Sequence, residues 1–271
     1  MLQNLHTHTT LCDGRDTPEQ VVRHAIEKGF DSVGFSGHGI TEFAIDCELR
    51  DVSGYIAEIN ALKKRFEDQI NVFLGIELDY YSAGLMPEDC YDYVIGSVHF
   101  ARMNGDEYLD FDYKPEIMRS QINKFFGGDK NAYAKKYYET LADMPNRIRA
   151  DIVGHFDLLT KFTEKCPDIL DIESREYKNA ALEALHAVRE RMELFEVNTG
   201  AISRGHRTTP YPAPFILDEM KRLDCKLILT SDCHDKRFID CHFDETKEYL
   251  KSHGFNSLWY LTKDGFVEKP I

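Results

Sequence analysis

Short apolar runs alternate with longer helical stretches along most of this 271-residue chain. The apolar runs have the length and composition of buried strands, and most of them are followed by the periodicity of an amphipathic helix. The seven predicted strands lie within residues 1–6, 31–38, 70–80, 91–100, 150–157, 193–199 and 225–234. Strands that alternate with helices predict a parallel sheet, because each helix returns the chain to the same end of the sheet.

The predicted helices occupy residues 17–30, 51–68, 114–143 (in two stretches), 174–191, 213–223 and 244–253. The first of them has a clear start signal. Thr17 is a plausible N-cap, Pro18 suits the first helical position, and Gln20 can complete a capping box. An extended segment is expected at residues 257–262.

The number of strands and the chain length favour a closed or nearly closed barrel, so we expect a single domain over residues 1–271. An open doubly wound sheet is the alternative. It is weakened because no Gly-x-Gly-x-x-Gly loop follows the first predicted strand.

The charge and cysteine content exclude several classes of protein. A net charge of −14 disfavours nucleic acid and anionic membranes as partners, but it tolerates a substrate that carries positive charge. No apolar stretch is long enough for a membrane helix, and the N-terminus has no signal-like segment. The seven cysteines are scattered without a Cys-x-x-Cys pair, which predicts reduced thiols and a cytoplasmic location.

Each predicted strand carries a metal-capable or polar side chain at or near its end. In chain order these are His6 and His8, His38, Glu77, His99, His155, Glu196 and Asn198, and Asp232 and His234. A single histidine after an apolar run is usually structural, but coincidence does not explain so many at equivalent positions. Because active sites of parallel barrels gather at the C-terminal ends of the strands, we predict a ring of ligands around one mouth.

The residue types in this ring point to metal chemistry. Imidazole and carboxylate ligands together suit Zn²⁺, Mn²⁺ or Fe²⁺. His6 and His8 project from the same face of an extended segment and can hold one ion together. With Asp13 added, the ligands are too many for one ion, so two or three divalent ions and a bridging carboxylate are expected. Clustered ions activate a shared water and favour phosphoryl transfer.

The motifs that carry these residues resemble those of a known family. They are "HTHTTLCDG", "GFSGHG", "GIELDY", "GSVHF", "VGHFD", "FEVNTG" and "SDCH", and they span residues 6–234. In this order they resemble the polymerase and histidinol phosphatase (PHP) family of metal hydrolases. The segments "HTHTTLCDGRDTPEQVV", "SVHF" and "EVNTG" are most similar to those of stand-alone histidinol-phosphate phosphatases.

The resemblance implies a distorted, TIM-like (β/α)₇ barrel with a trinuclear metal centre at its mouth. One ion would be held by His6, His8, Glu77 and Asp232. Glu77 would bridge to a second ion on His99 and His155, and a third would lie on Asp13, His38 and His234. One departure is Gly37, where the family more often has an acidic residue that could support His38.

These observations predict a phosphomonoesterase that acts on a small phosphorylated substrate. Three residues are expected to be catalytic. Glu77 would act as the bridging ligand, and His234 or Asp13 would supply a proton to the leaving group. Arg204 is the first candidate to bind the phosphate, followed by Arg207 and then Arg15. The resemblance implies L-histidinol phosphate as the substrate. Another phosphoester such as a nucleotide, amide or ring hydrolysis, and a non-enzymatic metal-binding protein are the alternatives. The oligomeric state is not indicated.

Overall fold

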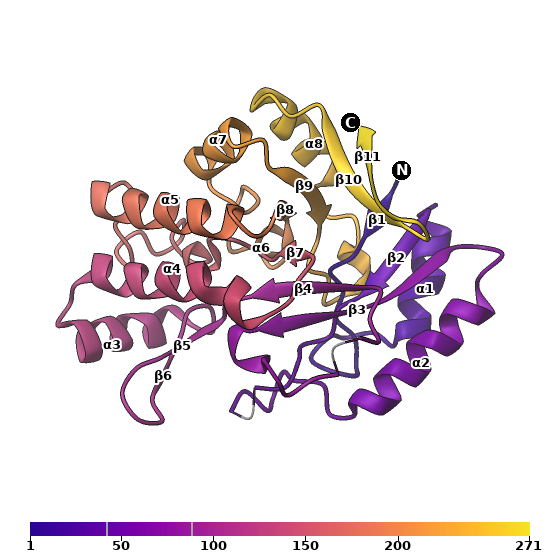
Figure 1. The fold of residues 1–271 in the computed structure, drawn as a ribbon, viewed down its shortest axis with the longest axis horizontal. Helices are drawn as coiled ribbons and strands as arrows, with labels where there is room; N and C mark the ends of the chain where they lie inside the picture. The colour runs from indigo at the N-terminus through magenta and orange to yellow at the C-terminus, as the bar shows by residue number, and fades with distance from the viewer. Residues whose placement is uncertain (42, 88) are drawn as a thin grey trace.

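The computed structural model describes residues 1–41, 43–87 and 89–271. Its main element is a seven-stranded parallel sheet with the strand order β1-β2-β3-β4-β7-β8-β9 (Figure 1). The strands are β1 (Gln3–Asn4), β2 (Ser32–Phe35), β3 (Asn71–Asp79), β4 (Tyr93–Ser97), β7 (Ile152–Val153), β8 (Leu194–Asn198) and β9 (Lys226–Thr230). The predicted parallel α/β class is therefore confirmed.

The sheet curls so that its first and last strands meet just beyond their C-terminal ends. Thr7 and Cys233 form a parallel bridge. The backbone N–H of His8 donates to the Cys233 carbonyl at 2.8 Å, and the Cys233 N–H donates to the His6 carbonyl at 2.9 Å. We call this pairing the closing bridge. It makes the sheet a nearly closed barrel, as predicted, and excludes the open-sheet alternative.

The first strand is shorter than expected, and its polar side chains explain why. The side-chain amide of Asn4 donates to the His6 carbonyl at 3.2 Å and to Thr7 Oγ1 at 3.1 Å. The same amide reaches Ser231 Oγ at 2.8 Å. These bonds replace part of the strand ladder, so the chain can turn inward where His6 begins the mouth of the barrel.

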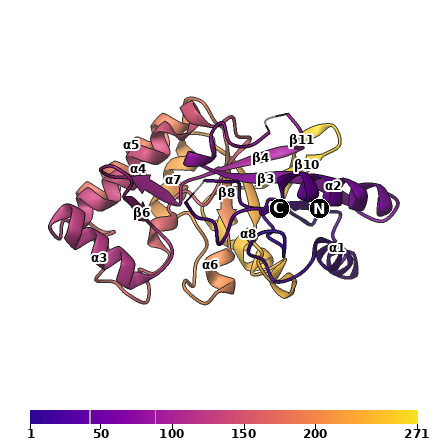
Figure 2. The ribbon, with the colours of Figure 1, turned by 90° about the horizontal axis from the view of Figure 1, so that it is seen from below.

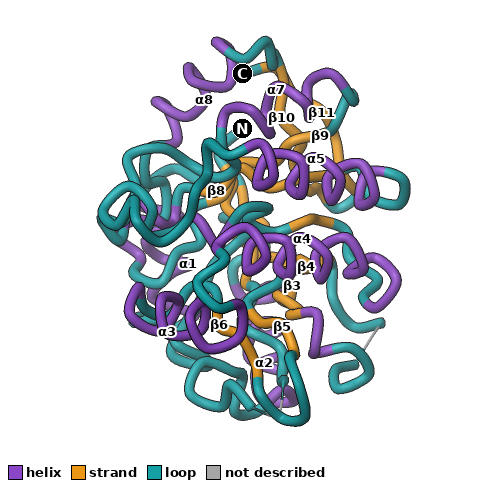
Figure 3. Tube along the Cα trace, turned by 90° about the vertical axis from the view of Figure 1, so that its left-hand side faces the viewer, coloured by secondary structure: helices purple, strands orange, loops and turns teal. Residues whose placement is uncertain are grey.

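The helices surround the barrel, and all except a four-residue helix after β8, which was not predicted, begin close to the predicted positions. They are α1 (Pro18–Glu27), α2 (Val52–Arg65), α3 (Pro115–Phe126), α4 (Lys130–Arg147), α5 (Arg175–Arg189), α6 (Gly200–Ser203), α7 (Pro214–Arg222) and α8 (Phe243–Ser252). The capping box of Thr17 and Gln20 is present at the start of α1. Helices α4 and α5 lie side by side (Figure 3). Within the described residues, no helix is long and apolar enough to cross a bilayer.

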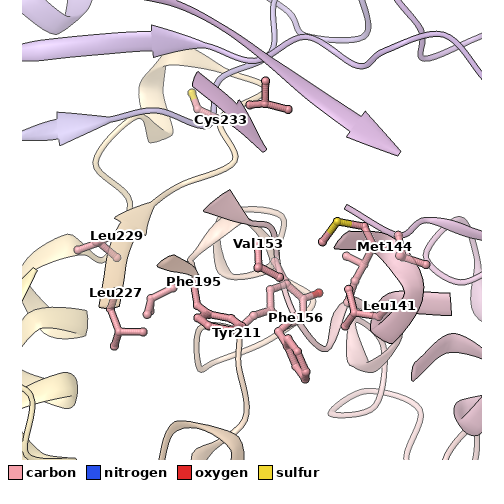
Figure 4. Close-up of a cluster of buried hydrophobic side chains, with 14 of the residues drawn as sticks. Leu141, Met144, Val153, Phe156, Phe195, Tyr211, Leu227, Leu229 and Cys233 are labelled. Carbon is pink, nitrogen blue, oxygen red and sulfur yellow. The ribbon is translucent and has the colours of Figure 1, made fainter. Parts of the chain in front are cut away.

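Apolar packing fills both sides of the strands. Outside the barrel, Val153, Phe195 and Leu227 are buried in one cluster with Leu141 and Met144 of α4 (Figure 4). Inside the barrel, a second cluster fills the space with side chains from several strands and the C-terminal hairpin: Leu5, Phe73, Tyr93, Ile95, Ile152, Leu194, Ile228 and Leu261. The interior is thus packed away from the mouth, and the polar side chains collect at the mouth.

Two antiparallel hairpins complete the fold. The first consists of β10 (Ser257–Thr262) and β11 (Gly265–Pro270). Its Leu261 backbone is bonded to the Gln3 side chain at 2.8 and 2.9 Å, and the two chain ends lie close together on this side (Figure 2). The second, β5 (Phe100–Arg102) and β6 (Tyr108–Asp110), follows β4 and was not predicted.

Candidate metal centre

All of the predicted metal ligands come together at the mouth of the barrel. They form four overlapping groups, in each of which one ligand atom per residue lies within 4.8 Å of the others. The groups are His8, Asp13, His38 and His234; His6, His8 and Asp232; His6, Glu77 and His155; and His38, Glu77 and His99. The closing bridge holds the segments that carry His6, His8 and Asp232 against each other.

Glu77 occupies the centre of this arrangement, and its two carboxylate oxygens face different imidazoles. Oε1 lies 3.0 Å from His155 Nε2 and 3.5 Å from His99 Nε2. Oε2 faces three other rings, with distances of 3.2 Å to His6 Nε2, 3.5 Å to His8 Nε2 and 3.0 Å to His38 Nδ1. A carboxylate shared in this way has the geometry of a bridge between two metal ions.

The hydrogen bonding of this cluster also fits bound cations. His6 Nε2, His8 Nε2 and Glu77 Oε2 are buried, and none has a hydrogen-bond partner within the described part of the chain. A buried polar atom without a partner costs about 1–3 kcal/mol, so several such atoms aimed at one another require an explanation. Divalent ions supply it, because neutral imidazole and carboxylate are their usual protein ligands.

The electrostatics of His8 favour its metal-binding form. Burial, together with the imidazoles of His234 and His38, lowers the pKa of His8 to about 3. The ring is therefore neutral at ordinary pH, and a neutral imidazole has a free lone pair for a metal.

The third predicted group lies nearest to solvent. Asp13 Oδ2 is 3.2 Å from His234 Nε2 and 3.7 Å from His38 Nε2. Burial opposes ionisation of Asp13, but His38 and His234 together lower its pKa well below the ordinary value. At Gly37, a Cβ atom would lie 2.8 Å from Leu49 Cδ2, so Leu49 occupies the space that a larger side chain at this position would need.

Glu196 lies behind the metal ligands and orients them. Its Oε1 is 2.5 Å from His6 Nδ1 and also accepts a hydrogen bond from Thr230 Oγ1 at 2.6 Å. Its Oε2 accepts from the His155 backbone N–H at 2.7 Å and from Asn198 Nδ2 at 3.0 Å. Because Nδ1 is thus engaged, Nε2 of His6 faces the centre. The sequence predicted that Glu196 lies on a strand, but it did not indicate that the carboxylate orients His6.

Glu196→Gln is therefore expected to weaken metal binding by about 10- to 100-fold, because the amide keeps the size of the side chain but removes the charge behind His6. Dialysis against buffers of graded chelator strength, followed by metal analysis, measures this shift. Glu193→Gln is a matched control, since Glu193 directly precedes β8 and its side chain is half exposed. Unchanged metal affinity in Glu196→Gln would contradict the orienting role.

The three predicted arginines are placed differently. Among them, Arg204 alone lines the described cavity at the mouth, where Nη2 donates to Asp232 Oδ2 at 2.8 Å and Nη1 donates to His234 Nδ1 at 3.1 Å. Arg207 is buried elsewhere, with its guanidinium bonded to Thr160 and Thr209. Arg15 is 71% exposed beside Asp235. The structure therefore brings neither Arg207 nor Arg15 to the cavity.

The cavity itself has a volume of about 350 Å³ and opens over the ligand groups. Several of its wall residues were missed by the sequence analysis: Phe100, Asp110, Asp112, Tyr113, Leu158 and Lys161. Lys161 Nζ lies 2.9 Å from both the Asp112 carboxylate and the Asp112 carbonyl. Most of these residues belong to the β5–β6 hairpin or the turn after it, and the alternation in "YLDFDY" was the one available signal.

Comparison with known sequences gives consistent matches. The family model described as PHP domain matches residues 4–200. A Schizosaccharomyces pombe protein named probable histidinol-phosphatase is 25% identical over 93% of this chain and 88% of its own length. The Bacillus subtilis histidinol-phosphatase is 28% identical over 84% of this chain and 92% of its own length.

Comparison with solved structures supports the same fold. The histidinol phosphate phosphatase of Lactococcus lactis superposes with a TM-score of 0.69 at 20% identity, covering 98% of each chain. That crystal structure contains zinc, L-histidinol and phosphate. At this level of identity the likeness establishes the barrel architecture.

Proposed function

The chain belongs to the PHP domain family, and from this premise we propose that it is a metal-dependent phosphatase that hydrolyses L-histidinol phosphate to L-histidinol and phosphate. The observation that carries the proposal is the position of Glu77, shared between two sets of imidazoles on the floor of a cavity. The relatives that cover most of the chain are named for this activity.

We propose that three ion positions are available. As the family resemblance implies, the first would be formed by His6, His8, Glu77 and Asp232, the second by Glu77, His99 and His155, and the third by Asp13, His38 and His234. Distances support Glu77 as the shared ligand, because its Oε1 lies near His99 and His155 and its Oε2 near His6 and His8. The zinc in the Lactococcus lactis structure supports the proposal that this chain binds zinc. Manganese and iron suit the same ligand types. When bound, such ions supply an activated water at neutral pH and neutralise charge on the phosphoryl oxygens.

Arg204 is suited to bind the phosphate. Its contacts with Asp232 and His234 fix the guanidinium at the cavity wall. Its buried Nε has no hydrogen-bond partner among the residues that the structure describes. A fixed guanidinium with donors to spare matches the oxygens of a phosphate group.

His234 and Asp13 are the candidates to supply the proton that the leaving group needs. The two side chains lie together at the cavity, with His234 Nε2 3.2 Å from Asp13 Oδ2. An imidazolium at His234 could give a proton to the leaving oxygen and would itself become neutral imidazole. The same two residues belong to the proposed third ligand group.

A cytoplasmic location and one barrel domain over residues 1–271 remain part of the proposal. The seven cysteines, all within the described residues, are free thiols in the structure, which supports a reducing compartment.

The test is phosphate release from a panel of esters after metal-free protein has been reloaded with Zn²⁺, Mn²⁺ or Fe²⁺ separately. We expect kcat/KM for L-histidinol phosphate to exceed that for nucleoside monophosphates by about 100-fold or more, because a site that pairs polar groups of its substrate rejects esters that lack them. Equal or better turnover of nucleotides would reject the substrate assignment. No turnover of any ester by metal-loaded protein would reject the phosphatase proposal.

A further inference from the structure

We propose that Asp110 binds the positively charged part of the leaving alcohol and so selects phosphate esters of cationic alcohols. The proposal rests on the function proposed above and assigns a recognition residue within the same cavity. Asp110 lines the cavity wall together with Phe100 and Tyr113.

The β5–β6 hairpin places Asp110 beside the metal centre. Asp110 is the register partner of Phe100, the residue that follows His99. The next residue, Phe111, donates its backbone N–H to the His99 carbonyl at 3.1 Å. A ligand whose phosphate lies at the metal groups therefore extends its other end toward this hairpin.

The Asp110 side chain is held rigidly in place. Its Oδ1 accepts hydrogen bonds from the backbone N–H groups of Asp112 at 3.1 Å and Tyr113 at 2.9 Å. Both bonds use the same oxygen, which leaves Oδ2 for a ligand. A carboxylate that is already ordered loses little conformational freedom when it binds a partner.

The neighbouring acidic side chains have hydrogen-bond or ion-pair partners, whereas within the described residues no cationic side chain pairs with Asp110. Asp112 is paired with Lys161 at 2.9 Å, and Asp232 is paired with Arg204 at 2.8 Å. Glu48 accepts the Thr41 backbone N–H at 2.8 Å. Ion pairs have a nitrogen and a carboxylate oxygen no more than 4.0 Å apart. In the described part of the chain, no lysine, arginine or histidine nitrogen comes that close to the Asp110 carboxylate.

The electrostatic state of Asp110 agrees with a missing counter-ion. Burial and the neighbouring Asp112 carboxylate raise the pKa of Asp110. An ammonium or imidazolium group on the substrate would reverse this effect, because an opposite charge favours the ionised carboxylate. Phe100, Leu158 and Tyr113 add apolar surface to the same cavity, which suits the flat faces of an imidazole ring.

The variant Asp110→Asn tests the proposal. The amide keeps one oxygen that can accept the bonds from Asp112 and Tyr113, so the turn is preserved while the charge is removed. Asp106→Asn is the matched control, because Asp106 lies in the same hairpin and its side chain is fully exposed. Both proteins and the wild type are loaded with the same metal and assayed on L-histidinol phosphate and on 4-nitrophenyl phosphate, whose leaving group carries no positive charge.

We expect Asp110→Asn to lower kcat/KM for L-histidinol phosphate by roughly 10- to 100-fold, as for loss of a charged hydrogen bond, and to lower kcat/KM for 4-nitrophenyl phosphate much less. The Asp106→Asn control should match the wild type on both esters. An unchanged preference in Asp110→Asn, or equal losses on both esters, would overturn the proposal.

Calorimetric binding of L-histidinol to the metal-loaded proteins, in the presence of phosphate, separates this proposal from the proposed function. Binding that is weakened in Asp110→Asn supports recognition by Asp110 whether or not the ester is hydrolysed. L-histidinol binding of equal strength in wild type and variant, or none in either, would overturn it. Failure of the wild type to release phosphate would instead count against the phosphatase activity.

Discussion

Glu77→Gln is expected to lower kcat/KM for phosphomonoester hydrolysis by about 1,000-fold or more and to reduce the bound metal. Changing a residue that only supports a ligand costs about 10- to 100-fold, and a carboxylate shared by two ion positions contributes to both. In the structure, its two oxygens face His99 and His155 on one side and His6, His8 and His38 on the other. Steady-state assays and metal analysis of the same preparations measure the two effects.

Glu116→Gln provides the matched control for this variant, since Glu116 is 75% exposed at the start of α3. Far-ultraviolet circular dichroism should show the same secondary structure in both variants. Full activity of Glu77→Gln with a normal metal content would show that this carboxylate is not a shared ligand.

Removing the metals from the wild-type protein is expected to abolish turnover and to lower the melting temperature by about 8 °C or more. A ligand present at 1,000 times its dissociation constant stabilises the native state by about 4 kcal/mol, and 1 kcal/mol corresponds to about 2–4 °C in a chain of this size. Without ions, His6, His8 and Glu77 retain buried atoms that lack hydrogen-bond partners among the described residues. Calorimetric melting with and without chelator measures the loss.

The control for metal removal is the Glu77→Gln protein, whose melting temperature should respond much less to the chelator. Restoring the wild-type melting temperature and turnover with added Zn²⁺ or Mn²⁺ would show that the loss is reversible. Equal melting temperatures of loaded and stripped wild-type protein would contradict a contribution of metal binding to stability.

The barrel and the gathering of the ligands at its mouth could be predicted because both follow from the order of the strands, since a side chain at the C-terminal end of a parallel strand has a defined place at the mouth. Which ligands share an ion does not follow from that order. The resemblance implied a group of Glu77, His99 and His155, whereas the structure places His155 in a group with His6 and Glu77, and His99 in a group with His38 and Glu77.

The β5–β6 hairpin could not be predicted in the same way. Each of its strands has three residues, which is too short for a clear periodicity.

The predictions for Arg204 and Arg207 were limited by a similar problem, because both follow β8 within one short segment. Arg204 ends α6 beside Asp232, whereas Arg207 turns away toward Thr160. Sequence spacing does not distinguish these two directions, since tertiary packing determines them.

The closing bridge has a consequence for the biosynthesis of the protein. Residues near the beginning of the chain bond to residues more than 200 positions later, as in Asn4 with Ser231 and Asp13 with His234, which are 227 and 221 positions apart. A nascent chain on the ribosome therefore lacks complete first and third ligand groups until the segment after β9 has emerged. Such long-range closure is slow relative to local helix formation. Metal binding at the proposed first and third positions would therefore require that synthesis has passed β9.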